Sequence, residues 1–193
     1  MTKDREQMLL HPTPDCNYSL IYQKKALFQD FCQDPDIFEM LHNPILEKQG
    51  ADPEDYYCIN VYPFLKIPDV QSVAKNFICY EVNDLEDYGA NNVMMRRQIT
   101  IRVMCDASEV DTPYGIPRQD VLAMLIDERM QWTEVFGSRL EKVYDAGKTS
   151  ENGYYYRNMY YEQTTPNNLQ RGFSENALDA KGRGYYAIED SFI

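Results

Sequence analysis

The clearest pattern of apolar and polar positions lies in residues 93–107, VMMRRQITIRVMCDA. In an extended chain, every second side chain from position 95 to 105 points the same way, and this set is apolar except for Arg97. The other set contains Arg96, Gln98, Thr100 and Arg102 and no acidic residue. The alternation predicts a β-strand with one apolar face and one polar face that carries arginines.

Shorter runs predict four further strands, at residues 56–67, 76–84, 139–147 and 154–165. Pro63 places the far half of the first strand at a sheet edge or a bulge. We predict a loop at residues 85–92. The stretch KTSENG, which ends in Gly153, predicts a hairpin between the last two strands.

Apolar residues at helical spacing predict a helix at residues 18–33. A short helix follows, with Asp34 as its N-cap and Pro35 at its first position. Residues 43–55 contain the Pro, Gly and Asp typical of a loop.

A longer helix is predicted within residues 111–132, DTPYGIPRQDVLAMLIDERMQW. Asp111 or Thr112 caps the turn before it, and Pro117 is expected at its first helical position. Gly137 is the expected C-terminal stop. The residues expected to pack on the sheet are Val121, Leu122, Leu125, Ile126 and Trp132.

These elements predict an α+β fold: a mainly antiparallel sheet of about five strands with one long helix packed on it, N-terminal helices and extended terminal arms. We divide the chain into an irregular N-terminal arm (1–17), a single domain (18–168) and a C-terminal tail (169–193). The tail either docks on a partner or folds back on its own domain through its apolar residues Tyr185, Tyr186, Ile188, Phe192 and Ile193.

The charge of the chain is strongly acidic, with 31 Asp and Glu against 19 Lys and Arg and a formal net charge of −12. No charge run is basic, which disfavours tight binding of nucleic acid but not its passage along an acidic wall. The 16 tyrosines suit surfaces that a partner buries, or simply reflect strand propensity.

No apolar run is long enough for a signal peptide or a membrane span, so we expect a soluble protein that is made in the cytoplasm and does not enter a membrane. The cysteines are scattered and odd in number, which predicts buried, reduced thiols. They are Cys16, Cys32, Cys58, Cys79 and Cys105.

Residues for catalysis are sparse, so we expect no enzyme, no cofactor and no metal site. His11 and His42 adjoin no recognisable nucleophile, and no phosphate-binding glycine motif is present. The best enzymatic alternative is a metal-dependent nuclease built on Asp69 and Glu81, although Asn83 stands where a lysine is expected. Arg118 and Asp120 at the start of the longer helix are interpreted as structural: a cap, a dipole partner and an ion pair between subunits.

Residues 58–168 resemble the tail terminator (head–tail joining) proteins of long-tailed bacteriophages and related prophages. The segments that carry the resemblance are FICYEVNDLEDY, RRQITIRVMCDASEVDTPYGIPRQDVLAMLID, WTEVFGSRLEKVYD and YEQTTPNN. The most specific part is TPYGIPRQDVLA.

The resemblance implies a structural virion protein of the tail or neck, made in the host cytoplasm, that forms a six-membered (hexameric) ring. Such a ring caps the tail tube, ends tube polymerisation and joins the tail to the neck or connector (stopper) protein, while DNA only passes through the lumen. A head–tail connector (adaptor or stopper) is the alternative within virion assembly, and a monomeric binding module is a third interpretation.

Two features are hypothesised to make subunit, tube or neck contacts. The arginine-bearing strand face is expected to meet acidic residues of a neighbour, and residues 111–116 are expected to form a contact loop held by the helix that follows. In the alternative, Tyr114 packs over its own core. The candidate contact residues are Arg96, Arg102, Asp111, Tyr114, Arg118, Tyr185 and Tyr186.

Overall fold

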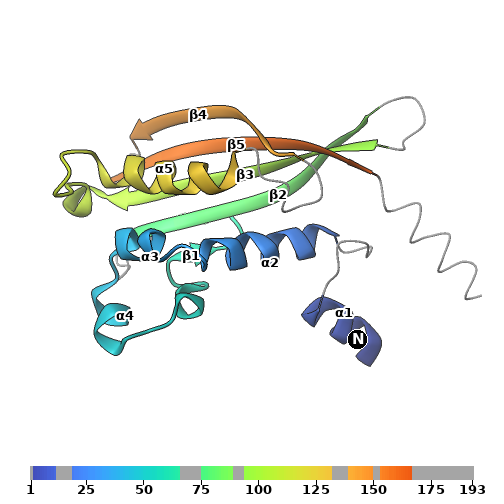
Figure 1. The fold of residues 1–193 in the computed structure, drawn as a ribbon, viewed down its shortest axis with the longest axis horizontal. Coiled ribbons are helices and arrows are strands. Elements are labelled where there is room, and N and C mark those ends of the chain that lie inside the picture. Colours follow the sequence, from blue (N-terminus) through green and yellow to red (C-terminus); the bar gives the residue numbers. More distant parts are fainter. Residues whose placement is uncertain are drawn as a thin grey trace, which may run out of the picture.

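The sheet dominates the computed structural model of the chain, which describes residues 2–11, 19–65, 75–88, 94–131, 139–149 and 153–166. Its strand order is β1-β2-β3-β5-β4 (Figure 1). The β1–β2 pair is parallel and the other pairs are antiparallel, so the predicted α+β class with a mainly antiparallel sheet is confirmed. The strands are β1 (Val61–Tyr62), β2 (Asn76–Tyr88), β3 (Met94–Asp106), β4 (Glu141–Thr149) and β5 (Tyr154–Pro166).

The alternation predicted for residues 93–107 sets the two faces of the sheet. Ile101 of β3 pairs with Tyr80 of β2 and Met159 of β5, and all three side chains are fully buried. Directly opposed residues share a face, so this row continues the apolar face across three strands. Arg97 lies on the same face but is buried, with its guanidinium bound to Asp84.

Helices cover this apolar face (Figure 1). The helices are α1 (Lys3–Leu10), α2 (Ser19–Phe31), α3 (Pro35–Leu41), α4 (Pro44–Gln49) and α5 (Arg118–Met130), with 3-10 turns η1 (Pro53–Tyr56) and η2 (Ala107–Glu109). The core combines Leu27 and Phe31 of α2, Ile37 of α3 and Leu122 and Ile126 of α5 with the strand residues. None of the described helices has the length and hydropathy needed to cross a membrane.

Two predicted irregular segments are helical instead. Residues 1–17 were expected to form an irregular arm, but α1 occupies Lys3–Leu10, and the Lys25 ammonium donates hydrogen bonds to the carbonyls of Leu9 and Leu10 at its end. The predicted loop at 43–55 contains α4 and η1, because Pro44 occupies a first helical position and the Asn43 side chain accepts from two backbone N–H groups.

Other boundaries also differ from the prediction. The strand expected at 56–67 shrinks to Val61–Tyr62, because the chain turns at Cys58, whose φ is +58°. In contrast, β2 continues into the first half of the loop predicted at 85–92, since a bulge after Asp84 restores its pairing with β3 as far as Tyr88, and residues 89–92 lie outside the described residues. Helix α5 begins at Arg118, one residue after Pro117, and ends at Met130, whereas Trp132 and Gly137 lie outside the described residues.

Three buried asparagines tie the helical region to the sheet. The Asn43 side-chain amide donates to Asn60 (2.7 Å), the Asn60 amide donates to the Asn76 carbonyl (2.8 Å), and the Asn76 amide donates to the Leu41 carbonyl (2.9 Å). All three are buried, at 3%, 0% and 0% exposure. Because buried polar groups are costly when unpaired, this chain fixes α3 and α4 against the start of β2.

We predict that Asn60→Leu lowers the free energy of unfolding by about 1–3 kcal/mol for each buried group that loses its hydrogen-bond partner. The two partners are the Asn43 amide and the Asn76 carbonyl. Urea unfolding followed by circular dichroism measures the change. Asn83→Leu, at an exposed position of β2, is the control and should shift stability by no more than about 0.5 kcal/mol. Equal effects of the two variants would contradict the role given to the asparagine chain.

Candidate functional site

The loop between η2 and α5 projects apolar side chains from one end of the sheet. Tyr114 is 67% exposed and Ile116 is 49% exposed, so Tyr114 does not pack over the core. The Thr112 hydroxyl donates to the Ile116 carbonyl (2.6 Å), and the Gly115 N–H donates to the Thr112 carbonyl (3.2 Å). Gly115 has a φ of +71°, which a side chain would strain. Local hydrogen bonds therefore shape the loop.

Arg118 fastens this loop to the helical layer. Its Nε donates to the Glu109 carbonyl (2.6 Å), and its Nη1 donates to the Met40 carbonyl (3.0 Å) near the end of α3. Its backbone N–H donates to the Val110 carbonyl (2.8 Å). The Arg118 guanidinium therefore supplies donors to carbonyls of its own chain, and its hypothesised contact with a partner stays a prediction.

Two adjoining hollows flank Tyr114, and we call them together the Tyr114 groove. They have volumes of about 590 and 430 Å³ and share Glu39, Met40 and Tyr114. These volumes fall in the range of about 300–1,000 Å³ that is usual for binding sites. The first hollow is also lined by Pro35, Phe38, His42, Glu47, Gly50, Ala51, Pro53, Tyr56, Thr112, Pro113 and Arg118, and the second by Asp36, Ile116, Asp120, Val121, Met124 and Leu125.

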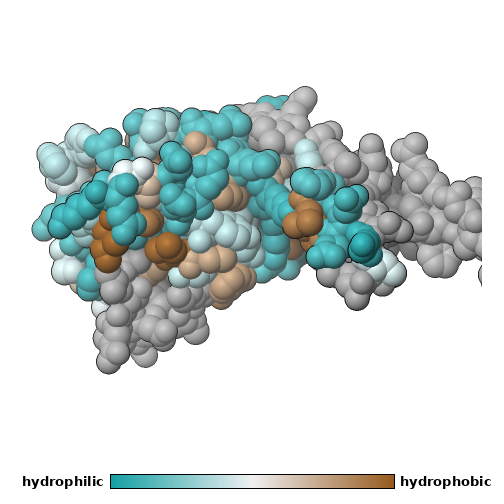
Figure 2. All heavy atoms as spheres, turned by 90° about the horizontal axis from the view of Figure 1, so that it is seen from below, coloured by the Kyte–Doolittle hydropathy of each residue, from teal (hydrophilic) through white to brown (hydrophobic). Residues whose placement is uncertain are grey.

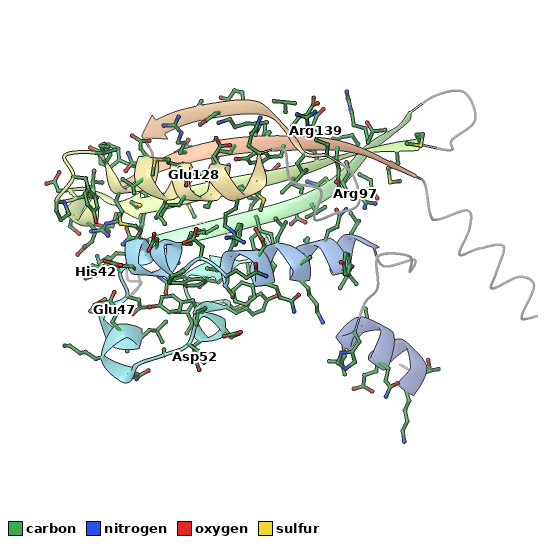
Figure 3. All side chains as sticks on the ribbon, viewed as in Figure 1. His42, Glu47, Asp52, Arg97, Glu128 and Arg139 are labelled. Carbon is green, nitrogen blue, oxygen red and sulfur yellow. The ribbon has the colours of Figure 1, made fainter. Side chains whose placement is uncertain are left out.

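The groove combines apolar walls with acidic edges. Met124 is 50% exposed, and at this end of the molecule Figure 2 shows small hydrophobic areas set among hydrophilic side chains. Asp36 and Glu39 contribute carboxylates from exposed positions of α3. On the side of α4, the His42 ring lies 3.1 Å from the Glu47 carboxylate, and both residues are labelled in Figure 3.

The arginine-bearing face of β3 meets acidic and polar residues of its own chain. Arg102 donates from Nε to Asn158 (2.8 Å) and lies over the Tyr156 ring, 5.5 Å from its centroid. Arg96 lies 3.7 Å from the Glu162 carboxylate. Asp106, the last residue of β3, is the strand's own acid on this face and pairs with Lys75, while β5 supplies Glu162 beside Arg96. A neighbouring subunit is therefore not needed to balance Arg96.

The remaining candidate contact residues are Asp111, Tyr185 and Tyr186. Asp111 is exposed beside Thr112 in the loop. Tyr185 and Tyr186 lie outside the described residues, as do Asp69 and Cys16.

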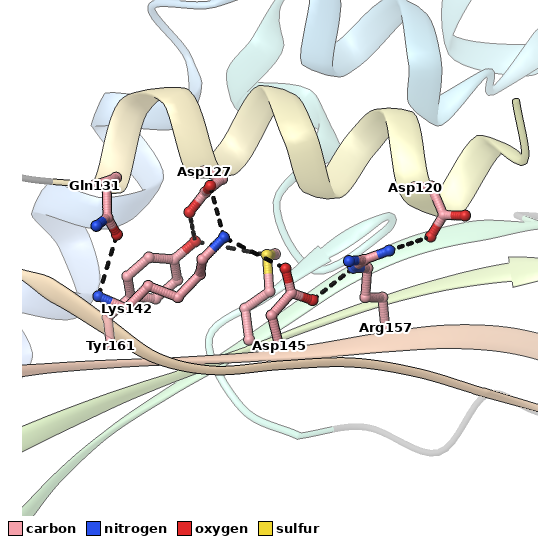
Figure 4. A network of polar contacts seen from close by, with 8 residues as sticks. Asp120, Asp127, Gln131, Lys142, Asp145, Arg157 and Tyr161 are labelled. Carbon is pink, nitrogen blue, oxygen red and sulfur yellow. Dashed lines mark hydrogen bonds and ion pairs between the residues drawn. The ribbon is translucent and has the colours of Figure 1, made fainter.

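A charged network between α5 and the sheet escaped the sequence reasoning (Figure 4). Arg157 of β5 bridges Asp120 of α5 (2.7 Å) and Asp145 of β4, and Lys142 bridges Asp127 (2.8 Å) and Asp145 (3.4 Å). The Tyr161 hydroxyl also donates to Asp127 (2.8 Å). Asp120, expected to serve the helix dipole and a neighbouring subunit, is thus paired within its own chain.

The network perturbs the titration of its members. Burial alone would raise the pKa of Asp145, but the hydrogen bonds and charges of Arg157 and Lys142 hold that pKa below its ordinary value. Burial, together with the hydrogen bond to Asp127, raises the pKa of Tyr161. Each carboxylate of the network is balanced by an ion pair with Arg157 or Lys142. We therefore interpret the network as a structural one that holds α5 against the sheet.

The structure also describes the surroundings of Glu81 and of four of the five cysteines. Glu81 forms an ion pair with Lys24, and the described residues contain no group of three or more His, Cys, Asp or Glu placed to hold a metal ion. Cys79 and Cys105 are buried as expected, whereas Cys58 is exposed. Burial, together with the charge of Glu54, raises the pKa of Cys32 to about 11, which keeps its thiol protonated near neutral pH.

We predict that the stabilising effect of Asp145 disappears in acid. A carboxylate whose pKa is lowered by folding stabilises the fold above its unfolded pKa of about 3.9, and this contribution is lost as the pH falls through the folded value. Asp145→Asn should therefore cost about 1–3 kcal/mol of unfolding free energy at pH 7 and progressively less below pH 4. Urea titrations at several pH values test this, with Asp111→Asn as the exposed control. A cost independent of pH would be inconsistent with an ionised Asp145.

We predict that two substitutions in the same region change the stability of the isolated chain to very different extents. Tyr114→Ala should change the free energy of unfolding by no more than about 0.5 kcal/mol, because the side chain is exposed. Arg118→Met should cost about 1.5–3 kcal/mol, because it removes charged donors to two backbone carbonyls. Thermal and urea unfolding measure both. A large loss of stability in Tyr114→Ala would show that the loop serves the fold.

The YomW family matches residues 34–163 of the chain. No curated protein matches it. The family match begins at the N-cap of α3 and ends near the end of β5, so it includes the described sheet, the Tyr114 groove and the charged network. Because it spans more than half of the sequence, the chain belongs to the YomW family.

Proposed function

We propose that this chain is a structural virion protein that forms a ring on the end of a bacteriophage tail tube, stops tube growth and joins the tail to the neck. The observation that carries the proposal is the fold of TPYGIPRQDVLA, the segment on which the resemblance to tail terminators chiefly depends. It forms the exposed loop around Tyr114 and the first turns of α5.

The geometry of this loop suits protein contact. Its exposed Tyr114 and Ile116 stand on a backbone already held by hydrogen bonds from Thr112, Gly115 and Arg118. A preorganised apolar projection loses little conformational entropy when a partner buries it. Tyrosine is also a frequent anchor residue in protein interfaces.

The head–tail connector remains the alternative, because the same loop can serve a contact one ring higher in the neck. The nuclease alternative loses support, because Glu81, one of its two carboxylates, is engaged by the Lys24 ammonium. The two structural functions differ in partner: a terminator binds tail-tube protein, whereas a connector binds the portal-side adaptor.

We predict that the chain, produced together with the tail-tube protein of the same phage, forms rings at tube ends and limits tube length. Negative-stain electron microscopy measures both. Tyr114→Ala should yield overlong tubes while the subunit melts within a few degrees of the wild type, because only the contact is lost. Val143→Ala, which alters an exposed side chain on β4, is the control and should cap normally. A chain that leaves tube ends bare and tube length unchanged contradicts the proposal, and binding to the portal-side adaptor instead favours the connector.

A further inference from the structure

The Tyr114 groove combines exposed apolar walls with acidic edges. Its second hollow has apolar walls from Val121, Met124 and Leu125, and Met40 lies between the two hollows. Tyr114, Ile116 and Met124 are each about half exposed or more. Methionine side chains are flexible and polarisable, so such a floor can adapt to aromatic side chains. Clustered exposed apolar residues of this kind mark a binding surface.

The charges around the floor define the occupant more closely. Asp36 and Glu39 stand at exposed positions of α3, and Glu39 borders both hollows. Asp120 is also acidic but is already paired with Arg157. Arg118, the cation of the first hollow, is held by two backbone carbonyls. The complementary ligand therefore carries aromatic or aliphatic groups next to positive charge.

The C-terminal segment of this chain has that composition at residues 181–188, KGRGYYAI. Lys181 and Arg183 precede Tyr185 and Tyr186, and no acidic residue interrupts them before Glu189. This short stretch combines two cations and two tyrosines without an acid, in a chain with a net charge of −12. The segment lies outside the described residues.

The length of the connecting chain permits this docking. The start of β5 pairs with the end of β3, which leads into the Tyr114 loop, so β5 ends at Pro166 at the far end of the sheet. Thirteen residues of strand span roughly 40 Å. Fifteen residues from Pro166 to Lys181 reach at most about 50 Å, which suffices, whereas the seven residues to Phe173 reach only about 25 Å.

We propose that the Tyr114 groove is a docking site for residues 181–188 of the chain's own C-terminal segment. The two tyrosines pack on Met40 and Met124, and the two cations lie beside Asp36 and Glu39. This inference does not depend on the proposed ring function, because it concerns what covers the groove in the purified chain.

Photo-crosslinking of the full-length chain tests the proposal. Tyr185 is replaced by p-benzoylphenylalanine, whose excited ketone inserts into nearby C–H bonds and favours methionine, and the products are mapped by mass spectrometry. We expect crosslinks to Met40 or Met124. Products at monomer mass assign the segment to its own groove, and products at dimer mass assign it to the groove of a second copy. The same probe at Phe173 is the matched control and should not mark the groove.

A charge exchange provides the second arm of the test. Glu39→Lys and Arg183→Glu should each lower the crosslink yield several-fold, because each places like charges together, and the double variant should restore it. Glu39 is exposed, so Glu39→Lys should not unfold the chain. Crosslinks that map outside the groove, a yield no higher than that of the Phe173 probe, or a double variant without recovery would each overturn the proposal.

Discussion

Burial of one face of the sheet is the constraint on which the rest of this structure depends. The row of Tyr80, Ile101 and Met159 runs across three strands, and each such buried side chain contributes about 1.5–3 kcal/mol when it is removed from water. The strands cannot cover this face themselves. Helices α2 and α3, which precede them, and α5, which lies between β3 and β4, provide the cover, so residues distant in sequence must be held in fixed relative positions.

Two kinds of polar fastening hold that cover in place. The first is a chain of hydrogen bonds in the buried junction between α3, α4 and the start of β2, made by Asn43, Asn60 and Asn76. In the second, Arg118 joins the start of α5 to a carbonyl of α3, while Arg157 and Lys142 join α5 to β4 and β5. These bonds satisfy groups that would be costly to leave unpaired, and they leave the loop between η2 and α5 projecting from a rigid base.

The polar contacts within the domain engage several of its cations, and exposed carboxylates remain around the Tyr114 groove. Lys24, Lys142 and Arg157 are each engaged by carboxylates within the domain, and Arg118 by backbone carbonyls. Asp36 and Glu39, by contrast, border the groove from exposed positions. Carboxylates around an apolar surface favour cationic, aromatic segments as ligands. That preference links the contact loop of the proposed ring function with the basic, tyrosine-containing C-terminal segment.

Local patterns in the sequence determined the elements whose cause is local. The period-two alternation of residues 93–107 predicted β3, and the Asp34-Pro35 pair predicted the start of α3, because side-chain direction and capping depend only on near neighbours. The same reasoning took Pro44 for a loop residue, although a proline can equally begin a helix, and here the Asn43 side chain accepts from two N–H groups of the first turn of α4. Tyr114 was hypothesised to be a contact residue from the Gly and Pro residues of its loop, but the sequence did not predict its exposed fraction or the hollows beside it. Only the tertiary structure decided this exposure and the position of the hollows. It also paired Asp120 with Arg157, 37 positions away, and Arg118 with Met40, 78 positions away, because contacts between residues so far apart in the chain leave no periodic pattern in the sequence.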